Sequence, residues 1–169
     1  MSLRSASGLT LLEMVMVMAI LSIIVAIGVP SLSGLTKNSR LTSQANEFIA
    51  TLHLARSEAL KRGEQVVVCR SADLESCASN GDWDQGWIVF VDFDEDKARS
   101  SDEELLRTKE ALKGRSTLIG GENLKEKVIF LPNGASNQNG GITLCNDQDG
   151  LKMLIIRSGR VRTEEVGCS

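Results

Sequence analysis

The sequence has little of what active sites and metal centres are usually built from. It contains one histidine, His53, and its four cysteines form no C-x-x-C pair, so a zinc site would lack ligands at the usual spacing. There is no P-loop and no nucleophile elbow. The glycine-rich stretch 137–141 precedes a predicted strand, whereas a phosphate cradle needs a helix there. These absences predict a protein that is not an enzyme and needs no cofactor.

The charge balance argues against a protein that binds nucleic acids through an overall positive charge. The 169 residues carry 19 Lys and Arg against 22 Asp and Glu, a net charge of -3. A mildly acidic chain is not a bulk nucleic-acid binder, although it can still carry a local basic patch. No internal repeat or low-complexity tract is present. Outside the apolar N-terminal run, roughly 130–140 residues remain, which is enough for one domain with its own core.

An apolar run over residues 9–29 contains one carboxylate, Glu13. The run can cross a bilayer, because about 20 apolar residues suffice. A secretory signal peptide is one alternative, since Ala26 and Gly28 give a small-x-small match. Pro30 close behind them is unfavourable for that cleavage, and a plain membrane anchor is the other alternative. Neither explains a carboxylate so early in the run, where its cost indicates a function.

The pattern after Pro30 remains helical. Lys61 and Arg62 suit the C-terminal end of a helix, and Gly63 suits the position that follows it. We therefore predict one long helix from about Leu9 to Arg62, in which residues 28, 30 and 34 allow a kink or local melting. Its second half is amphipathic, with an apolar stripe at helical spacing formed by Leu41, Ala45, Phe48, Leu52, Ala55 and Ala59.

From residue 65 the periodicity becomes that of strands. Gly, Asn, Asp and Ser punctuate the gaps between them, as in hairpins and turns. The result is an α+β fold in which the long N-terminal helix packs on an antiparallel sheet. The predicted strands cover residues 65–70, 87–92, 127–131, 142–145 and 153–157, with weaker candidates at 105–108 and 117–119.

The residues from Gly8 to Glu13, preceded by a short leader with Arg4, resemble the processing site of type IV pilins and type II secretion pseudopilins. The resemblance implies that prepilin peptidase cuts after Gly8 and methylates the new N-terminus at Leu9. It also implies that Glu13 pairs with the N-terminal amine of a neighbouring subunit during assembly. Pro30 belongs to the same assembly segment.

Later segments narrow the resemblance to GspH/FimT-type minor pilins and pseudopilins. They are the helix 41–63, the strand 86–92, the turn 130–134 and the ending 158–162 before a terminal cysteine. The resemblance implies a leader (1–8), a transmembrane and polymerisation helix (9–29), an amphipathic helix (30–63) and a periplasmic β-rich domain (64–169).

The implied location is the inner membrane, crossed once, with the C-terminal domain in the periplasm and, after assembly, at the tip of an extracellular pilus. The implied partners are other major and minor pilins or pseudopilins, prepilin peptidase and the inner membrane. The implied function is to support filament initiation or tip assembly in a type IV pilus or a type II secretion pseudopilus.

The four cysteines predict two disulfides. An anchor that sends the rest of the chain across the inner membrane places them in an oxidising compartment. Four cysteines allow three connectivities. Proximity in the sequence and the family resemblance favour Cys69–Cys77 and Cys145–Cys168.

A basic stretch near the C-terminus is the first candidate binding site. In FimT-like minor pilins a Gly-Arg-x-Arg motif is linked to capture of DNA, and residues 159–162 match it. Arginines two apart share one face of a strand and suit phosphates, so we expect weak, sequence-independent binding of double-stranded DNA. The alternative is an edge strand protected from aggregation, and Glu164 and Glu165 weaken the DNA interpretation. The candidate residues are Lys152, Arg157, Arg160 and Arg162.

The acidic segment 92–103 is the second candidate binding site. Its spacing matches positions 1, 3, 5 and 12 of a calcium loop. Lys97 stands where the sharp turn of such a loop prefers glycine, and the segment connects strands rather than helices. A solvated acidic loop is therefore the alternative. The candidate ligands are Asp92, Asp94, Asp96 and Glu103.

Overall fold

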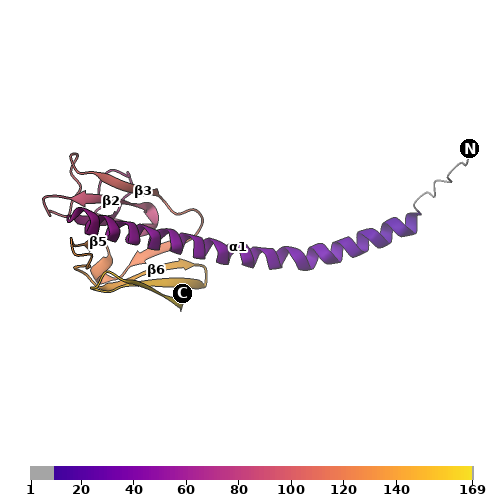
Figure 1. Ribbon diagram of the computed structural model, residues 1–169. Coiled ribbons are helices and arrows are strands. Elements are labelled where there is room, and N and C mark those ends of the chain that lie inside the picture. The colour runs from indigo at the N-terminus through magenta and orange to yellow at the C-terminus, as the bar shows by residue number, and fades with distance from the viewer. Residues whose placement is uncertain (1–9, 169) are drawn as a thin grey trace, which may run out of the picture. The chain divides into compact units, whose positions relative to one another are not determined.

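The computed structural model describes the backbone of residues 10–168 and the side chains of residues 10–25 and 38–168 (Figure 1). The predicted cleavage site at Gly8 and Leu9 and the side chain of Pro30 lie outside the described part. The chain separates into two units, divided between Asn38 and Ser39, and each is described by itself.

Helix α1 (Leu11–Arg62) begins in the first unit and ends in the second, which confirms the predicted helix. The Thr10 hydroxyl accepts a hydrogen bond from the Glu13 amide (3.3 Å) and so caps the first turn. The backbone remains helical through residues 28, 30 and 34, so it does not melt there. Among the described residues, no helix contains a segment with both the length and the apolarity of a membrane span.

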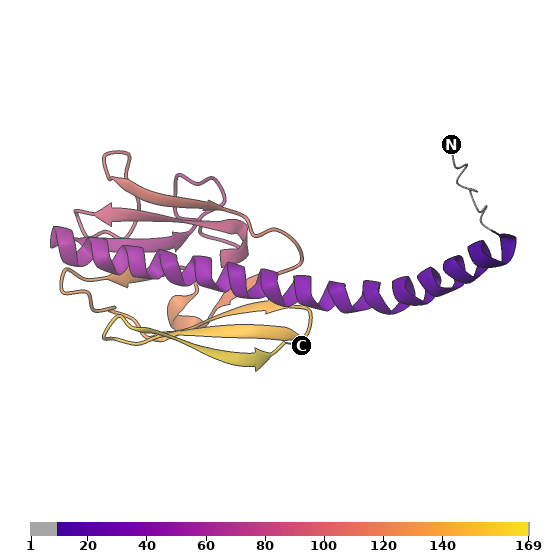
Figure 2. The same ribbon diagram turned by 45° about the vertical axis from the view of Figure 1, so that its right-hand side comes forward.

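The second unit contains two four-stranded antiparallel sheets rather than one (Figure 2). The first sheet runs in the order β3 (Leu105–Glu110), β2 (Gly86–Asp92), β1 (Gln65–Arg70) and β5 (Lys127–Phe130). The second runs in the order β4 (Thr117–Gly120), β6 (Gly140–Asn146), β7 (Asp149–Ile155) and β8 (Val161–Gly167). Two short 3₁₀ turns, η1 (Trp83–Gln85) and η2 (Glu122–Leu124), complete the unit.

All of the predicted strands are present, and β8 is an additional one. The sequence does not reveal β8 because its central residues, from Arg162 to Glu165, are polar and exposed. A strand on the open edge of a sheet needs no alternation of apolar residues, since its pairing with β7 is made by the backbone.

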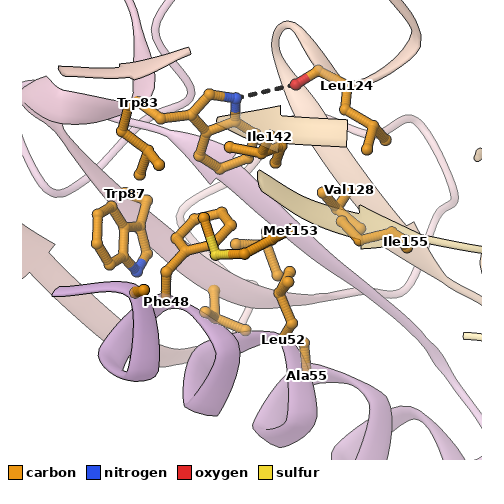
Figure 3. Packing of buried hydrophobic residues seen from close by; sticks show 14 of the residues in the cluster. Phe48, Leu52, Ala55, Trp83, Trp87, Leu124, Val128, Ile142, Met153 and Ile155 are labelled. Carbon is orange, nitrogen blue, oxygen red and sulfur yellow. Dashed lines mark hydrogen bonds between the residues drawn. The ribbon is translucent and has the colours of Figure 1, made fainter. Parts of the chain in front are cut away.

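The amphipathic half of α1 supplies the centre of the main core, and its whole predicted stripe is buried. Phe48 contacts Trp83 and Trp87 edge to face, with ring centroids 5.4 Å and 4.9 Å apart (Figure 3). The indole of Trp83 donates to the Leu124 carbonyl (2.9 Å) and that of Trp87 to the Thr51 hydroxyl (3.3 Å). Both tryptophans are therefore packing residues with satisfied polar ends.

The first sheet also buries its opposite face. Val67, Ile88 and Phe90 form a second, smaller cluster there with Cys69 and Ile129. Every residue of β1 and β2 is consequently buried, which explains their continuous apolar runs. The loop that follows β1 covers this cluster with Leu74 and Cys77.

The structure joins Cys69 to Cys77 and Cys145 to Cys168, the two pairs that proximity and resemblance favoured. The first disulfide closes the loop after β1, and the second ties the C-terminal tail to β6. The second bond passes over Gly150, where a Cβ would collide with the sulfur of Cys168.

Arg70, which is only 2% exposed, holds the loop of the first disulfide from inside. Its guanidinium donates to the carbonyl oxygens of Ala78 (3.1 Å), Ser79 (2.7 Å) and Gly81. Glu126 lies 3.6 Å from the same guanidinium and offsets its charge. A buried cation is tolerated here because several acceptors surround it.

Arg56 fastens α1 to two turns of the β-rich part. Its Nε donates to the Gly134 carbonyl (2.9 Å) and its Nη2 to the Ser158 carbonyl (3.1 Å). Gly159 lies buried beside them at φ +75°, and a Cβ there would collide with the Gly134 carbonyl oxygen. Close packing and backbone conformation thus both require glycine at this position.

We predict that Phe48→Ala lowers the free energy of unfolding by about 3–5 kcal/mol, because the cavity would lie between two indoles. Leu60→Ala is the control, since Leu60 is on the same helix but 52% exposed and should cost about 1 kcal/mol or less. Urea unfolding monitored by tryptophan fluorescence measures both. Equal losses would contradict the central role of Phe48.

Gly159→Ala should lower the free energy of unfolding by about 2 kcal/mol or more, through the clash with Gly134 and the left-handed backbone. Gly167→Ala is a matched control, because nothing lies within 4 Å of a Cβ at that position. We expect it to change stability by about 0.5 kcal/mol or less. Thermal unfolding followed by circular dichroism compares the two, and an unchanged Gly159 variant would refute the packing requirement.

Candidate functional site

Glu13 lies in the first turns of α1, on a helix whose apolar side chains are open to solvent. Leu11 is 83% exposed, Leu12 70% and Met16 60%. Every large apolar side chain from Met14 to Val25 is also exposed, and Val25 is 57% exposed. A soluble surface rarely presents so much contiguous apolar area, so this segment has the character of a contact surface.

The basic residues lie on and beside the β7–β8 hairpin. Leu154 pairs with Arg162 and Lys152 with Glu164, and the Ile156 amide donates to the Arg160 carbonyl (3.1 Å). Since side chains alternate along a strand, Arg160, Arg162 and Lys152 share the outer face, opposite the buried Met153 and Ile155. Arg157 lies in the turn and is exposed.

The three arginines of the β7–β8 hairpin and its turn are available for an external anion. Arg157, Arg160 and Arg162 are exposed, and their side chains make no ion pair with any described residue. Glu164 lies on the same face, directly across from Lys152, and reduces the positive potential at that end. The positive face is therefore narrow. Gly159 of the motif serves packing, because it lies against the Gly134 carbonyl and Arg56.

The acidic residues form a cluster at the end of β2. Asp92 is buried, Asp94 and Asp96 are exposed, and one carboxylate oxygen of each lies within 4.8 Å of the others. Glu103 does not join them. It is buried and accepts hydrogen bonds from the amides of Phe93 (3.0 Å) and Ser100 (2.9 Å).

The acidic loop, residues 93–104 between β2 and β3, bends without glycine. Lys97 has φ +66° and Glu95 has φ +60°, so both residues adopt the left-handed conformation that usually favours glycine. Hydrogen bonds from the Lys97 amide to Asp92 (3.2 Å) and from the Ala98 amide to Asp96 (2.7 Å) stabilise these bends. The predicted set of four carboxylates is thus reduced to three that meet and one that closes the loop.

The structure also gives roles to residues that the sequence did not single out. In the loop closed by Cys69–Cys77, hydrogen bonds from the Ser76 hydroxyl and from backbone amides hold the pKa of Asp73 well below its usual range. Burial raises the pKa of Asp84, helped by the nearby Asp82. Arg62 pairs with Glu58 (2.7 Å) and Glu104 (2.5 Å), and joins the end of α1 to the acidic loop.

A surface pocket of about 330 Å³ lies beside β5. Lys125, Lys127 and Lys97 line it together with Glu122 and Glu126, so its charge is mixed. Lys127 is already engaged, because its ammonium donates to the Lys97 carbonyl (2.7 Å). Three separate segments of the chain form this pocket, so no local sequence pattern marks it.

Comparison with known proteins covers both ends of the chain. The sequence model of the family "type II transport protein GspH" matches residues 44–159, and that of the prokaryotic N-terminal methylation motif matches residues 3–29. A search of curated proteins gives no significant match.

Two solved structures share the fold. The type IV minor pilin FimU of Pseudomonas aeruginosa is 22% identical, with a TM-score of 0.58 over 76% of this chain and 91% of FimU. The minor pseudopilin EpsH from the type 2 secretion system of Vibrio cholerae is 14% identical, with a TM-score of 0.53 over 74% of this chain and 96% of EpsH. The GspH match spans more than half of the chain and the methylation motif precedes it, so this protein belongs to the GspH family of minor pilins and pseudopilins.

Proposed function

We propose that this chain is a minor subunit of a type IV pilus or a type II secretion pseudopilus, and that it supports initiation of the filament or assembly of its tip. The observation that carries the proposal is the methylation motif at residues 3–29, joined in one chain to a GspH-family domain. The first is a signal for processing and assembly, and the second identifies the kind of subunit.

In this proposal prepilin peptidase cleaves after Gly8 and methylates Leu9. Residues 9–29 then anchor the subunit in the inner membrane as a single span, with the β-rich domain in the periplasm, and later pack against other pilins or pseudopilins. The exposed apolar side chains from Leu11 to Val25 support this step. Lipid or neighbouring helices would remove this area from water, which is the dominant favourable term in such associations.

Glu13 is the residue we assign to assembly, together with Pro30. An apolar filament core would make an unpaired carboxylate costly, so Glu13 requires a cationic partner there. Cleavage creates one at Leu9 of a neighbouring subunit. The role is structural, which agrees with a family of filament subunits, and it involves neither catalysis nor a cofactor.

A second candidate function is capture of double-stranded DNA by the same subunit. It is favoured by the shared outer face of Arg160 and Arg162 and by the absence of ion pairs to their side chains within residues 10–168. Lys152 and Arg157 would extend the contact along the hairpin. Binding would follow the phosphate backbone, independent of sequence and strongly weakened by salt.

The assembly proposal predicts that the wild-type chain from cells with prepilin peptidase begins at an N-methylated Leu9. Glu13→Gln should be processed normally but enter sheared filaments at least about tenfold less, because the partner amine loses its counter-charge. Mass spectrometry of the N-terminus and quantitative immunoblots measure the two steps.

Glu64→Gln is the control for the assembly test, since it makes the same change just beyond α1. A wild-type chain that retains residues 1–8, or equal incorporation of the Glu13 variant and wild type, would refute the proposal.

The DNA proposal predicts that the double variant Arg160→Gln/Arg162→Gln binds a DNA duplex at least about tenfold more weakly than wild type, because two phosphate contacts are lost. Wild-type affinity should fall about 100-fold between 50 and 200 mM salt if four cations contact phosphates. Fluorescence anisotropy with labelled DNA gives both numbers.

Lys113→Gln/Arg115→Gln is the matched control for DNA binding, because it removes two exposed cations elsewhere on the domain. Equal loss in both double variants would show a bulk charge effect and exclude a site on the hairpin.

A further inference from the structure

We propose that Asp92, Asp94 and Asp96 bind a calcium ion. The site lies where β2 ends and the acidic loop begins: Asp92 is the last residue of β2, and Asp94 and Asp96 belong to the loop. The inference is independent of the proposed roles in assembly and DNA capture, because it uses no residue of either.

The geometry of the cluster suits one ion. Calcium binds oxygen ligands at about 2.3–2.6 Å, so two ligands of the same ion lie at most about 5 Å apart. The three carboxylate oxygens all lie within 4.8 Å of one another. Small side-chain rotations would therefore let one ion contact Asp92, Asp94 and Asp96.

Asp92 supplies an independent reason to expect a ligand. The residue is 0% exposed, and its Oδ2 accepts hydrogen bonds from the Gln65 amide group (2.6 Å) and the Lys97 amide (3.2 Å). Its other oxygen, Oδ1, is buried and has no donor in the described part of the chain. A buried carboxylate oxygen without a partner is costly, and a cation at the cluster would supply that partner.

The surrounding charges leave the cluster uncompensated. Asp94 and Asp96 make no ion pair with a described residue, so three carboxylates repel one another over a short distance. Lys97, within the loop, makes no ion pair with the three carboxylates in the described part of the chain, and two other nearby cations are engaged by carbonyl groups. Lys127 donates to the Lys97 carbonyl (2.7 Å), and Arg99 donates to the Glu75 carbonyl (2.9 Å).

The ligand chemistry favours calcium over other divalent ions. Only oxygen ligands are present in the cluster, which disfavours zinc and copper. Magnesium requires near-ideal octahedral geometry at about 2.0–2.1 Å, whereas calcium accepts irregular sets of six to eight oxygens. Since Asp94 and Asp96 are exposed, water can complete the coordination shell.

Bound calcium would stiffen the connection from β2 to β3. Glu103 already closes the acidic loop through the amides of Phe93 and Ser100, and Glu104 joins it to Arg62 at the end of α1. Like charges meet at the cluster. An ion that offsets their repulsion would raise the stability of the domain.

The test titrates the full chain, purified in detergent, with calcium chloride by calorimetry and by thermal unfolding. Extracellular calcium modules have Kd values of about 0.1–1 mM, so about 10 mM calcium should saturate the site. We expect a saturable heat and a rise in Tm of about 5 °C near ten times Kd. Asp94→Asn and Asp96→Asn should each lose most of that rise, and both positions are exposed, so these variants should still fold.

Glu95→Gln is the matched control, because it removes one charge from the same loop but not from the cluster. It should keep the calcium response of the wild type. The proposal is overturned if the wild type shows no saturable response up to about 10 mM calcium, or if the Glu95 variant loses as much as the Asp94 variant. An equal response to magnesium chloride would overturn the assignment to calcium.

Discussion

Burial of the apolar stripe of α1 between the two sheets is the interaction on which the rest of the domain depends. Phe48 lies at its centre, in edge-to-face contact with Trp83 and Trp87, and the aliphatic residues along the stripe contact strands of both sheets. The turns η1 and η2 add Trp83 and Leu124 to the same core. The helix and residues from both sheets therefore share one core.

This arrangement separates the residues that form the core from the residues that remain free to bind other molecules. Strands β1 and β2 of the first sheet are buried along their whole length, and Asp92 at the end of β2 opens into the acidic loop. The second sheet is buried on its inner face, and its hairpin β7–β8 keeps an outer face for Arg160 and Arg162. The exposed apolar part of α1 is left for contacts that the single chain cannot make.

Much of the secondary structure could be predicted, because it depends on short-range periodicity. The helix and its apolar stripe were visible as a repeat of 3.6 residues, and the buried strands as short apolar runs bounded by turn residues. The split into two sheets and the polar edge strand β8 were not, because backbone pairing leaves no pattern in side chains. The candidate sites were found as spacings, but the separation of Glu103 from Asp92 depends on its hydrogen bonds to Phe93 and Ser100.

Residues close together in the chain suffice for the methylation motif at residues 3–29, the order of the elements and the membership of the family. Folding decides which residues distant in the sequence meet. Arg56 reaches Gly134 and Ser158, which explains Gly159 by packing, and Asp92 is buried with one oxygen unpaired beside Asp94 and Asp96. Such contacts form only in the folded chain, because packing of the core brings together residues that are far apart in the sequence.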